Sequence, residues 1–172
     1  MRLEDDDFLL FGLPQQFAQS VTEIDARWKA LQAKVHPDKF AADSAHAQRL
    51  AMQWALRVNE AQRRLRDPMA RAAYLCELRG AVIDAQRNTA MPRAFLMQQM
   101  QWRESLEAAV ELAQVESLDA QIEAEQANLV SLIAVQLDEL NQPEMAAQGV
   151  RALMFLKRFR QDISQRLDAL GQ

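Results

Sequence analysis

Apolar residues recur at helical spacing along most of the chain. After residue 20 they are separated by four, three and four positions: Ile24, Trp28, Leu31 and Val35. A second run has a similar period: Leu50, Trp54, Val58, Ala61 and Leu65. Steps of three and four place side chains on one face of an α-helix. The pattern predicts two amphipathic helices joined by a polar connection of about ten residues, which together form an antiparallel hairpin.

Shorter helices precede and follow this hairpin. Residues 7–11 form a short apolar helix that Gly12-Leu13-Pro14 ends, because glycine ends helices and the residue before proline avoids helical angles. Ser20 or Thr22 caps the helix that follows. The dipeptide Asp67-Pro68 ends the second long helix and opens a short one, which runs to Leu78 before Gly80.

The chain from Pro92 onward predicts three more helices, near 92–114, 117–141 and 143–170, with Ser117 and Pro143 at two of the starts. Their expected core stripes are Phe95, Trp102, Leu106, Ala109 and Ala113; Leu118, Ile122, Leu129, Ile133 and Leu140; and Val150, Leu153, Leu156, Ile163, Leu167 and Leu170. Residues 81–91 show no sustained period. We therefore expect an all-α protein with a helical-hairpin domain at 1–79, a linker at 80–91 and a three-helix bundle at 92–172.

Composition supports a helical protein in a reducing compartment. Hydrophobic residues make up 49% of the chain and charged residues 26%, with only 4 Gly and 5 Pro. The single cysteine, Cys76, cannot close an internal disulfide and leaves too few thiols for a zinc finger. The acidic N-terminus does not resemble a targeting segment, and every apolar run is shorter than the roughly 20 residues that span a bilayer. These features predict a cytoplasmic protein without a membrane anchor.

Charge is unevenly distributed along the chain. The net charge is −4, yet residues 20–66 hold 9 basic against 5 acidic residues, which favours an acidic partner for that segment. The segment has no Arg-Gly repeats or stacked aromatic residues, and the pI is about 5.3. Both observations argue against nucleic acid as the partner.

The helix near 92–114 has a second apolar face. At about 100° per residue, Leu96, Met97 and Met100 fall at about 100°, 200° and 140° from Phe95, with Glu104 near 180°. Phe155 is similarly about 200° from Leu153. One explanation is packing against the first domain or another helix. The other is a protein-binding patch, in which methionines adapt to a partner and Glu104 adds a charge at the rim.

The connection between the two hairpin helices contains His36-Pro37-Asp38-Lys39, which alone could be an ordinary helix stop. Its surroundings resemble the J-domain family, which has an aromatic residue, two basic residues and a leucine where this chain has Trp28, Lys29, Ala30 and Leu31, with Lys34 further on. Downstream matches are Val58-Asn59-Glu60-Ala61-Gln62, Leu65, Asp67-Pro68, Arg71 and Tyr74. The resemblance spans residues 7–79. Ala30 replaces a basic residue and Val35 replaces the usual tyrosine.

The J-domain resemblance implies a role and a set of contact residues. The tripeptide His36-Pro37-Asp38 and the basic residues Arg27, Lys29, Lys34 and Lys39 would dock on the ATPase domain and linker of a DnaK-type chaperone. Asp38 would engage an arginine of that chaperone, since a carboxylate–guanidinium pair has strict geometry. The sequence has no glycine-rich phosphate loop, so ATP hydrolysis is expected in the partner and not in this chain.

Two further segments resemble a narrower family, the HscB co-chaperones of iron–sulfur cluster assembly. These segments are Pro68 to Gly80 and Ala94-Phe95-Leu96-Met97-Gln98-Gln99. That resemblance implies the chaperone HscA and the scaffold protein IscU as partners. Its scaffold-binding surface, transferred by position, comprises Leu96, Met97, Met100, Gln101, Glu104, Ala108 and Phe155. Gln101 and Ala108 stand where the family often has acids, so binding here would depend more on apolar burial.

Two other functions are compatible with the sequence. A general J-domain co-chaperone with other clients would keep the hairpin's role and give the bundle a different one. A small hydrolase using His36 with Asp38 and Glu60 is less favoured, because no nucleophile accompanies them. We expect no cofactor or metal. We assign Cys76 to the core, since a single thiol supplies too few ligands for an iron–sulfur cluster.

Overall fold

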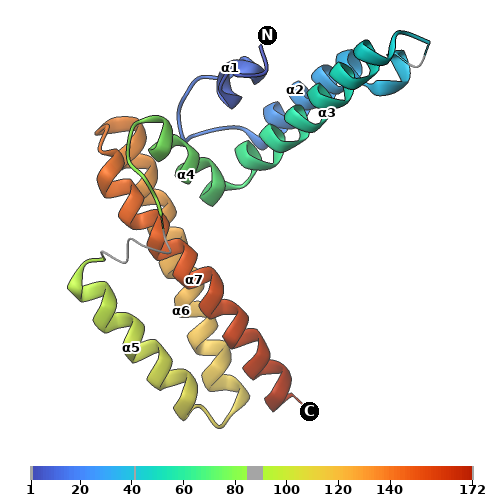
Figure 1. The fold of residues 1–172 in the computed structure, drawn as a ribbon. Helices are drawn as coiled ribbons and strands as arrows, with labels where there is room; N and C mark the ends of the chain where they lie inside the picture. The colour runs from blue at the N-terminus through green and yellow to red at the C-terminus, as the bar shows by residue number, and fades with distance from the viewer. Residues whose placement is uncertain (1, 41, 85–90, 172) are drawn as a thin grey trace. The chain divides into compact units, whose positions relative to one another are not determined.

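A computed structural model of the chain describes residues 2–40, 42–84 and 91–171 (Figure 1). These residues form helices and connections without a β-strand, which confirms the all-α prediction. The chain divides into two compact units, one up to Leu75 and one from Cys76 onward. Within the described ranges, no helix combines the length and apolarity needed to cross a membrane.

The first unit holds α1 (Asp7–Phe11), α2 (Val21–Val35), α3 (Ala45–Arg66) and most of α4 (Pro68–Leu78). Local signals set these limits. The Asp6 carboxylate accepts the Leu9 N–H at 2.9 Å at the start of α1, and Gly12 ends that helix with φ 63°. The Ser20 hydroxyl accepts the Glu23 N–H at 3.3 Å and caps α2. The bounds of α1 and α4 match the predicted ones. Of the two predicted caps for α2, Ser20 is the one observed.

Helices α2 and α3 lie side by side as the predicted hairpin (Figure 1). The core of this unit includes Phe8, Phe11, Ile24, Val35, Val58, Ala61, Leu65 and Leu75. One predicted core residue is wrong, because Leu50 is 40% exposed while Ala51 is 4% exposed. Ala51 and Val58 are seven residues apart, which is as helical a spacing as the predicted one, so the packing of α3 on α2 decides which residue faces inward.

A buried charge cluster fixes α1 against the rest of the first unit. The Asp7 side chain is fully buried and forms ion pairs with Arg57 at 2.6 Å and Arg64 at 3.0 Å. The Asp7 backbone N–H donates to the Tyr74 hydroxyl at 3.1 Å, and the Arg64 guanidinium lies 4.6 Å from the Tyr74 ring centroid. Because an unpaired buried charge is strongly destabilising, the burial of the Asp7 carboxylate depends on its ion pairs with Arg57 and Arg64.

The second unit is the predicted three-helix bundle of α5 (Arg93–Ala108), α6 (Leu112–Ala134) and α7 (Pro143–Leu170), with a π-helical turn, η2 (Val135–Glu139), after α6. Helix α7 has the predicted limits. The bundle core consists of Trp102, Ala109, Val115, Leu118, Ile122, Leu156, Phe159 and Ile163, with Phe95, Leu106, Leu129, Phe155, Leu167 and Leu170 packed against it. These residues include most of the predicted core stripes.

The boundary between the first two bundle helices differs from the prediction. Helix α5 ends at Ala108 instead of 114, and α6 begins at Leu112 instead of 117. The side-chain oxygen of Gln114 accepts the backbone N–H groups of Val110 at 2.9 Å and Glu111 at 3.1 Å, which starts α6 early. Ala113, predicted in the core, is consequently exposed, and Val115 is buried.

The π-helical turn η2 explains another incorrect core prediction. Leu140 is 54% exposed, whereas Leu137 is 1% exposed. Leu140 follows the buried Ile133 by seven residues. This spacing places Leu140 on the core-facing side only if the helix keeps 3.6 residues per turn up to that position. A π-turn has more residues per turn and so shifts the inward face by part of a turn.

The predicted linker at 80–91 is partly packed into the second unit. Ala81 is fully buried and Ile83 is 4% exposed. The Arg151 guanidinium donates to the Ile83 carbonyl at 3.2 Å. Residues 85–90 of the predicted linker lie outside the described residues. The division into domains at 79, 80–91 and 92 remains a prediction. The boundary between the two compact units along the chain falls within α4, between Leu75 and Cys76.

Helices α6 and α7 approach closely at Gly149. A Cβ added there would lie 2.9 Å from Ile133 Cγ1, and Ile133 is fully buried. We expect Gly149→Ala to lower the free energy of unfolding by about 1 kcal/mol, because overpacking outweighs the gain in helix propensity. Urea unfolding would measure the change. In an Ile133→Ala background the same substitution should cost nothing, and an equal loss there would contradict a steric cause.

Candidate functional site

The His36-Pro37-Asp38 loop lies directly after α2. His36 has extended backbone angles, and a single 3-10 turn, η1 (Pro37–Phe40), follows it. The Asp38 backbone N–H donates to His36 Nδ1 at 3.3 Å, and the same nitrogen lies 3.5 Å from Asp38 Oδ2. The Asp38 side chain is 89% exposed. Its carboxylate is therefore open to a cation on another protein.

The basic residues of α2 do not all share one side of the helix. Arg27 and Lys34 are seven residues apart, which is about 20° around the helix, whereas Lys29 is about 140° from Lys34. All three are exposed, as is Lys39 in η1, and Arg27 pairs with Glu23 at 3.1 Å. Arg27 and Lys34 thus form one basic edge and Lys29 another. Their role in chaperone binding stays a prediction.

Side-chain hydrogen bonds across the hairpin join α2 to α3. Trp28 Nε1 donates to Asn59 Oδ1 at 2.9 Å, and Gln32 donates to the same oxygen. Gln62 Nε2 donates to Asp25 Oδ1 at 3.1 Å. Asn59 and Gln62 belong to the segment that resembles the J-domain family, so part of that resemblance is explained by the joining of α2 and α3.

The three residues considered for a hydrolase, His36, Asp38 and Glu60, do not lie together. Glu60 lies 15 residues into α3, about 22 Å along the helix from the end that follows the His36 loop. Its carboxylate pairs with Arg64 at 2.8 Å. Glu60 therefore does not join His36 and Asp38 as a third catalytic residue. His46, on the first turn of α3, is exposed as expected.

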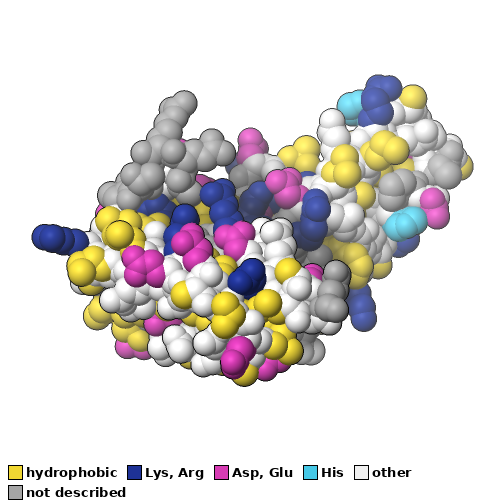
Figure 2. All heavy atoms as spheres, turned by 90° about the horizontal axis from the view of Figure 1, so that it is seen from below, with side chains coloured by type: hydrophobic (Ala, Val, Ile, Leu, Met, Phe, Trp, Pro, Cys, Tyr) yellow, Lys and Arg dark blue, Asp and Glu magenta, His cyan; other side chains and the backbone are white. Residues whose placement is uncertain are grey.

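Helix α5 presents the second apolar face to solvent. Leu96 is 43% exposed, Met97 55% and Met100 63%. Gln101, Glu104 and Ala108 are exposed on the same helix. Figure 2 shows hydrophobic side chains interspersed with acidic and basic ones on the face of the molecule that it presents. The surface predicted from α5 is thus available to a partner, although scaffold binding by it stays a prediction.

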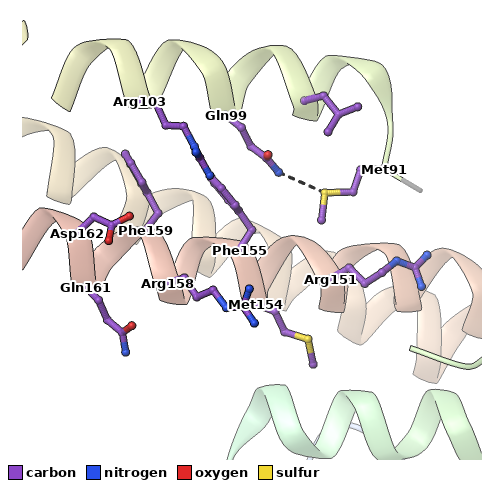
Figure 3. A pocket seen from close by; sticks show the side chains of 11 residues that line it. Met91, Gln99, Arg103, Arg151, Met154, Phe155, Arg158, Phe159, Gln161 and Asp162 are labelled. Carbon is purple, nitrogen blue, oxygen red and sulfur yellow. Dashed lines mark hydrogen bonds between the residues drawn. The ribbon is translucent and has the colours of Figure 1, made fainter. Parts of the chain in front are cut away.

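Phe155 is not part of this exposed face. It is partly buried, stacks on Phe159 with 5.8 Å between ring centroids, and meets Phe95 edge to face at 6.0 Å. The Arg103 guanidinium lies 5.6 Å from the Phe155 centroid. In Figure 3, the Arg103 side chain descends from α5 toward Phe155 on α7. The structure therefore places Phe155 between two helices, at the base of a groove.

The α5–α7 groove has a volume of about 530 Å³ and is lined by Leu96, Arg103, Arg151, Phe155, Arg158 and Asp162, among others (Figure 3). Leu96 borders both the groove and the exposed face of α5. Sequence reasoning missed the arginines. Their spacing offered a signal, because Arg151, Phe155, Arg158 and Asp162 follow one another at steps of four, three and four, which place them on one side of α7.

Cys76 is fully buried, and burial raises the pKa of its thiol to about 11. The thiolate is the reactive form, so at pH 8 only about one molecule in a thousand is reactive. We expect Cys76 to react with a thiol reagent very slowly in the native protein and rapidly in urea. A Cys76→Ser, Ser105→Cys variant supplies an exposed cysteine as the control, and equally fast native labelling of both proteins would contradict this expectation.

Comparison with known proteins gives consistent results. Residues 91–164 match the family model described as the HSCB C-terminal oligomerisation domain. The co-chaperone protein HscB homolog of Burkholderia multivorans is 46% identical, with 98% of this chain and 97% of the relative covered. That of Bordetella pertussis is 45% identical, with 93% and 95% covered.

Two solved structures share the fold. Chaperone HscB from Vibrio cholerae matches with a TM-score of 0.79 and 32% identity, over 96% of this chain and 99% of that one. Human co-chaperone protein HscB matches with a TM-score of 0.89 over 96% and 84%, and at 23% identity it supports the fold alone. The two helical units, the loop after α2 and relatives that span nearly the full length agree, and the chain belongs to the HscB family of co-chaperones.

Proposed function

We propose that this chain stimulates the ATPase of a DnaK-type chaperone, HscA, and delivers the iron–sulfur scaffold protein IscU to it, in support of cluster assembly and transfer. The observation that carries the proposal is the combination, in one chain of this family, of exposed His36 and Asp38 side chains in the loop after α2 and a separate exposed apolar face on α5. The two surfaces belong to different compact units, an arrangement that suits an adaptor with two partners.

The chaperone contact would be electrostatic and directional. The Asp38 carboxylate, 89% exposed, would form a charge-assisted pair with a chaperone arginine. Arg27, Lys29, Lys34 and Lys39 would steer the hairpin toward an acidic surface. Pro37, in the tripeptide, has a fixed φ, which lowers the entropy lost when the loop is held by the partner. This chain would act as a non-enzymatic partner, and hydrolysis would take place in the chaperone.

The scaffold contact would be mainly apolar. Leu96, Met97 and Met100 expose flexible side chains that adapt to a partner surface, with Glu104 at the rim. Gln101 and Ala108 add no charge, and Phe155 would contribute from the base of the α5–α7 groove that it lines. We further propose that the protein works in the cytoplasm without contact with nucleic acid or membrane.

A general J-domain co-chaperone with other clients is the alternative, and one experiment separates the two. ATP hydrolysis by HscA should rise when this protein is added, and rise more than additively when IscU is also present. Synergy is expected only if the bundle binds the scaffold. Stimulation that IscU does not change would favour the general co-chaperone, and no stimulation at all would contradict both.

A further inference from the structure

The α5–α7 groove carries an unbalanced charge. Three arginines line it, Arg103, Arg151 and Arg158, and Asp162 is the acid among its described lining residues. Neither Arg103 nor Arg158 forms an ion pair within the part of the chain that the structure describes. Arg151 is 5% exposed, and its Nε has no hydrogen-bond partner among these residues. Because Arg151 is buried and donates to the Ile83 carbonyl, the two exposed arginines, Arg103 and Arg158, are the cations of the groove that a ligand can reach.

The wall beside these arginines is apolar. Phe155 and Leu96 line the groove, and the Arg103 guanidinium lies 5.6 Å from the Phe155 ring centroid. Apolar surroundings lower the local dielectric and strengthen a hydrogen bond from a guanidinium to a carboxylate. The groove therefore combines cationic donors with a surface for an aromatic or aliphatic side chain.

We propose that the α5–α7 groove binds a segment of the scaffold protein in which an acidic side chain stands next to an apolar one. The carboxylate would pair with Arg103 and Arg158, and the apolar side chain would pack on Phe155. This inference rests on the proposed function, because its occupant is part of the scaffold protein. It adds a charged recognition element to a contact that the exposed face of α5 makes by apolar burial.

Isothermal titration of the full-length protein with IscU tests the inference. Arg158→Gln and Arg103→Gln should each weaken binding about five- to tenfold, because each removes one of the two guanidiniums that would pair with the carboxylate and leaves the other in place. Both residues are exposed, so neither change should unfold the bundle. Lys157→Gln is the matched control: it removes one positive charge from an exposed neighbour that does not line the groove, and should change affinity less than twofold.

Charge reversal identifies the partner residue. The Arg158→Glu variant of this protein should bind unaltered IscU weakly. An IscU variant in which the contacting acidic residue is changed to lysine should bind the Arg158→Glu variant well and the unaltered protein weakly. If the unaltered protein binds IscU and the two arginine variants match the Lys157→Gln control, this inference is wrong and the proposed function stands. If the unaltered protein does not bind IscU, both are wrong.

Discussion

An Asp38→Asn variant is expected to lose all measurable stimulation of HscA ATP hydrolysis. The substitution keeps the size of the side chain and removes the charge that would pair with a chaperone arginine. Truncating one partner of a charge-assisted pair at an interface costs about 2–5 kcal/mol, which corresponds to at least thirtyfold in affinity. Steady-state hydrolysis by HscA, measured with increasing amounts of wild type or variant, shows the difference.

The same variant should fold normally and keep its affinity for IscU. The Asp38 carboxylate is 89% exposed, and its backbone N–H donor to His36 is unchanged by the substitution. Asp43→Asn is the matched control, because it makes the same change at an exposed position in the same connection between α2 and α3. Full stimulation by Asp38→Asn, or equal loss in both variants, would contradict the assigned role of the tripeptide.

A Leu96→Ala, Met97→Ala variant is expected to bind IscU about 30- to 100-fold more weakly than wild type. Each truncation removes three groups of about methylene size, and burial of one such group contributes about 0.8 kcal/mol. Only part of that surface is buried by a partner, so about 2–3 kcal/mol is the combined expectation. Both side chains are about half exposed in the free protein, so the bundle should remain folded.

Two comparisons make this result specific. Leu140→Ala with Met145→Ala removes the same residue types at similar exposure, 54% and 50%, elsewhere in the second unit, and should leave affinity unchanged. Adding Phe155→Ala to the first variant should weaken binding further. Because Phe155 packs on Phe95 and Phe159, circular dichroism must show that the triple variant is folded. Unchanged affinity in that folded triple variant would show that the surface has no part in recognition.

Local signals predicted several elements correctly. A helix start needs only a capping side chain, as Ser20 supplies for α2, and a stop needs only a residue such as Gly12 with positive φ. Helix α7 spans Pro143–Leu170 as predicted, because a proline at the first position marks its start and an unbroken apolar period continues to its end. The second apolar face of α5 follows from the same periodicity, since one core can cover only one side of a helix, whereas its exposure did not follow from the sequence.

Local signals failed where a distant or unusual contact decided the outcome. Ser117 is a plausible cap, but Gln114 starts α6 earlier through its bonds to Val110 and Glu111. Leu140 has the correct spacing for the core until a π-turn shifts the inward face to Leu137.

The sequence by itself determined the helical class, the family and the presence of a second apolar face at Leu96, Met97 and Met100, because these depend on spacing along one helix or on short motifs. Only the structure decided that this face is exposed. Only the tertiary structure decided that Phe155 lies at the base of a groove with Arg103, Arg151 and Arg158 around it. Those residues come from α5 and α7, which are separated by the whole of α6 in the sequence. Spacing within one helix contains no information about which side chains of another helix will face it, and that arrangement arises only when the bundle packs.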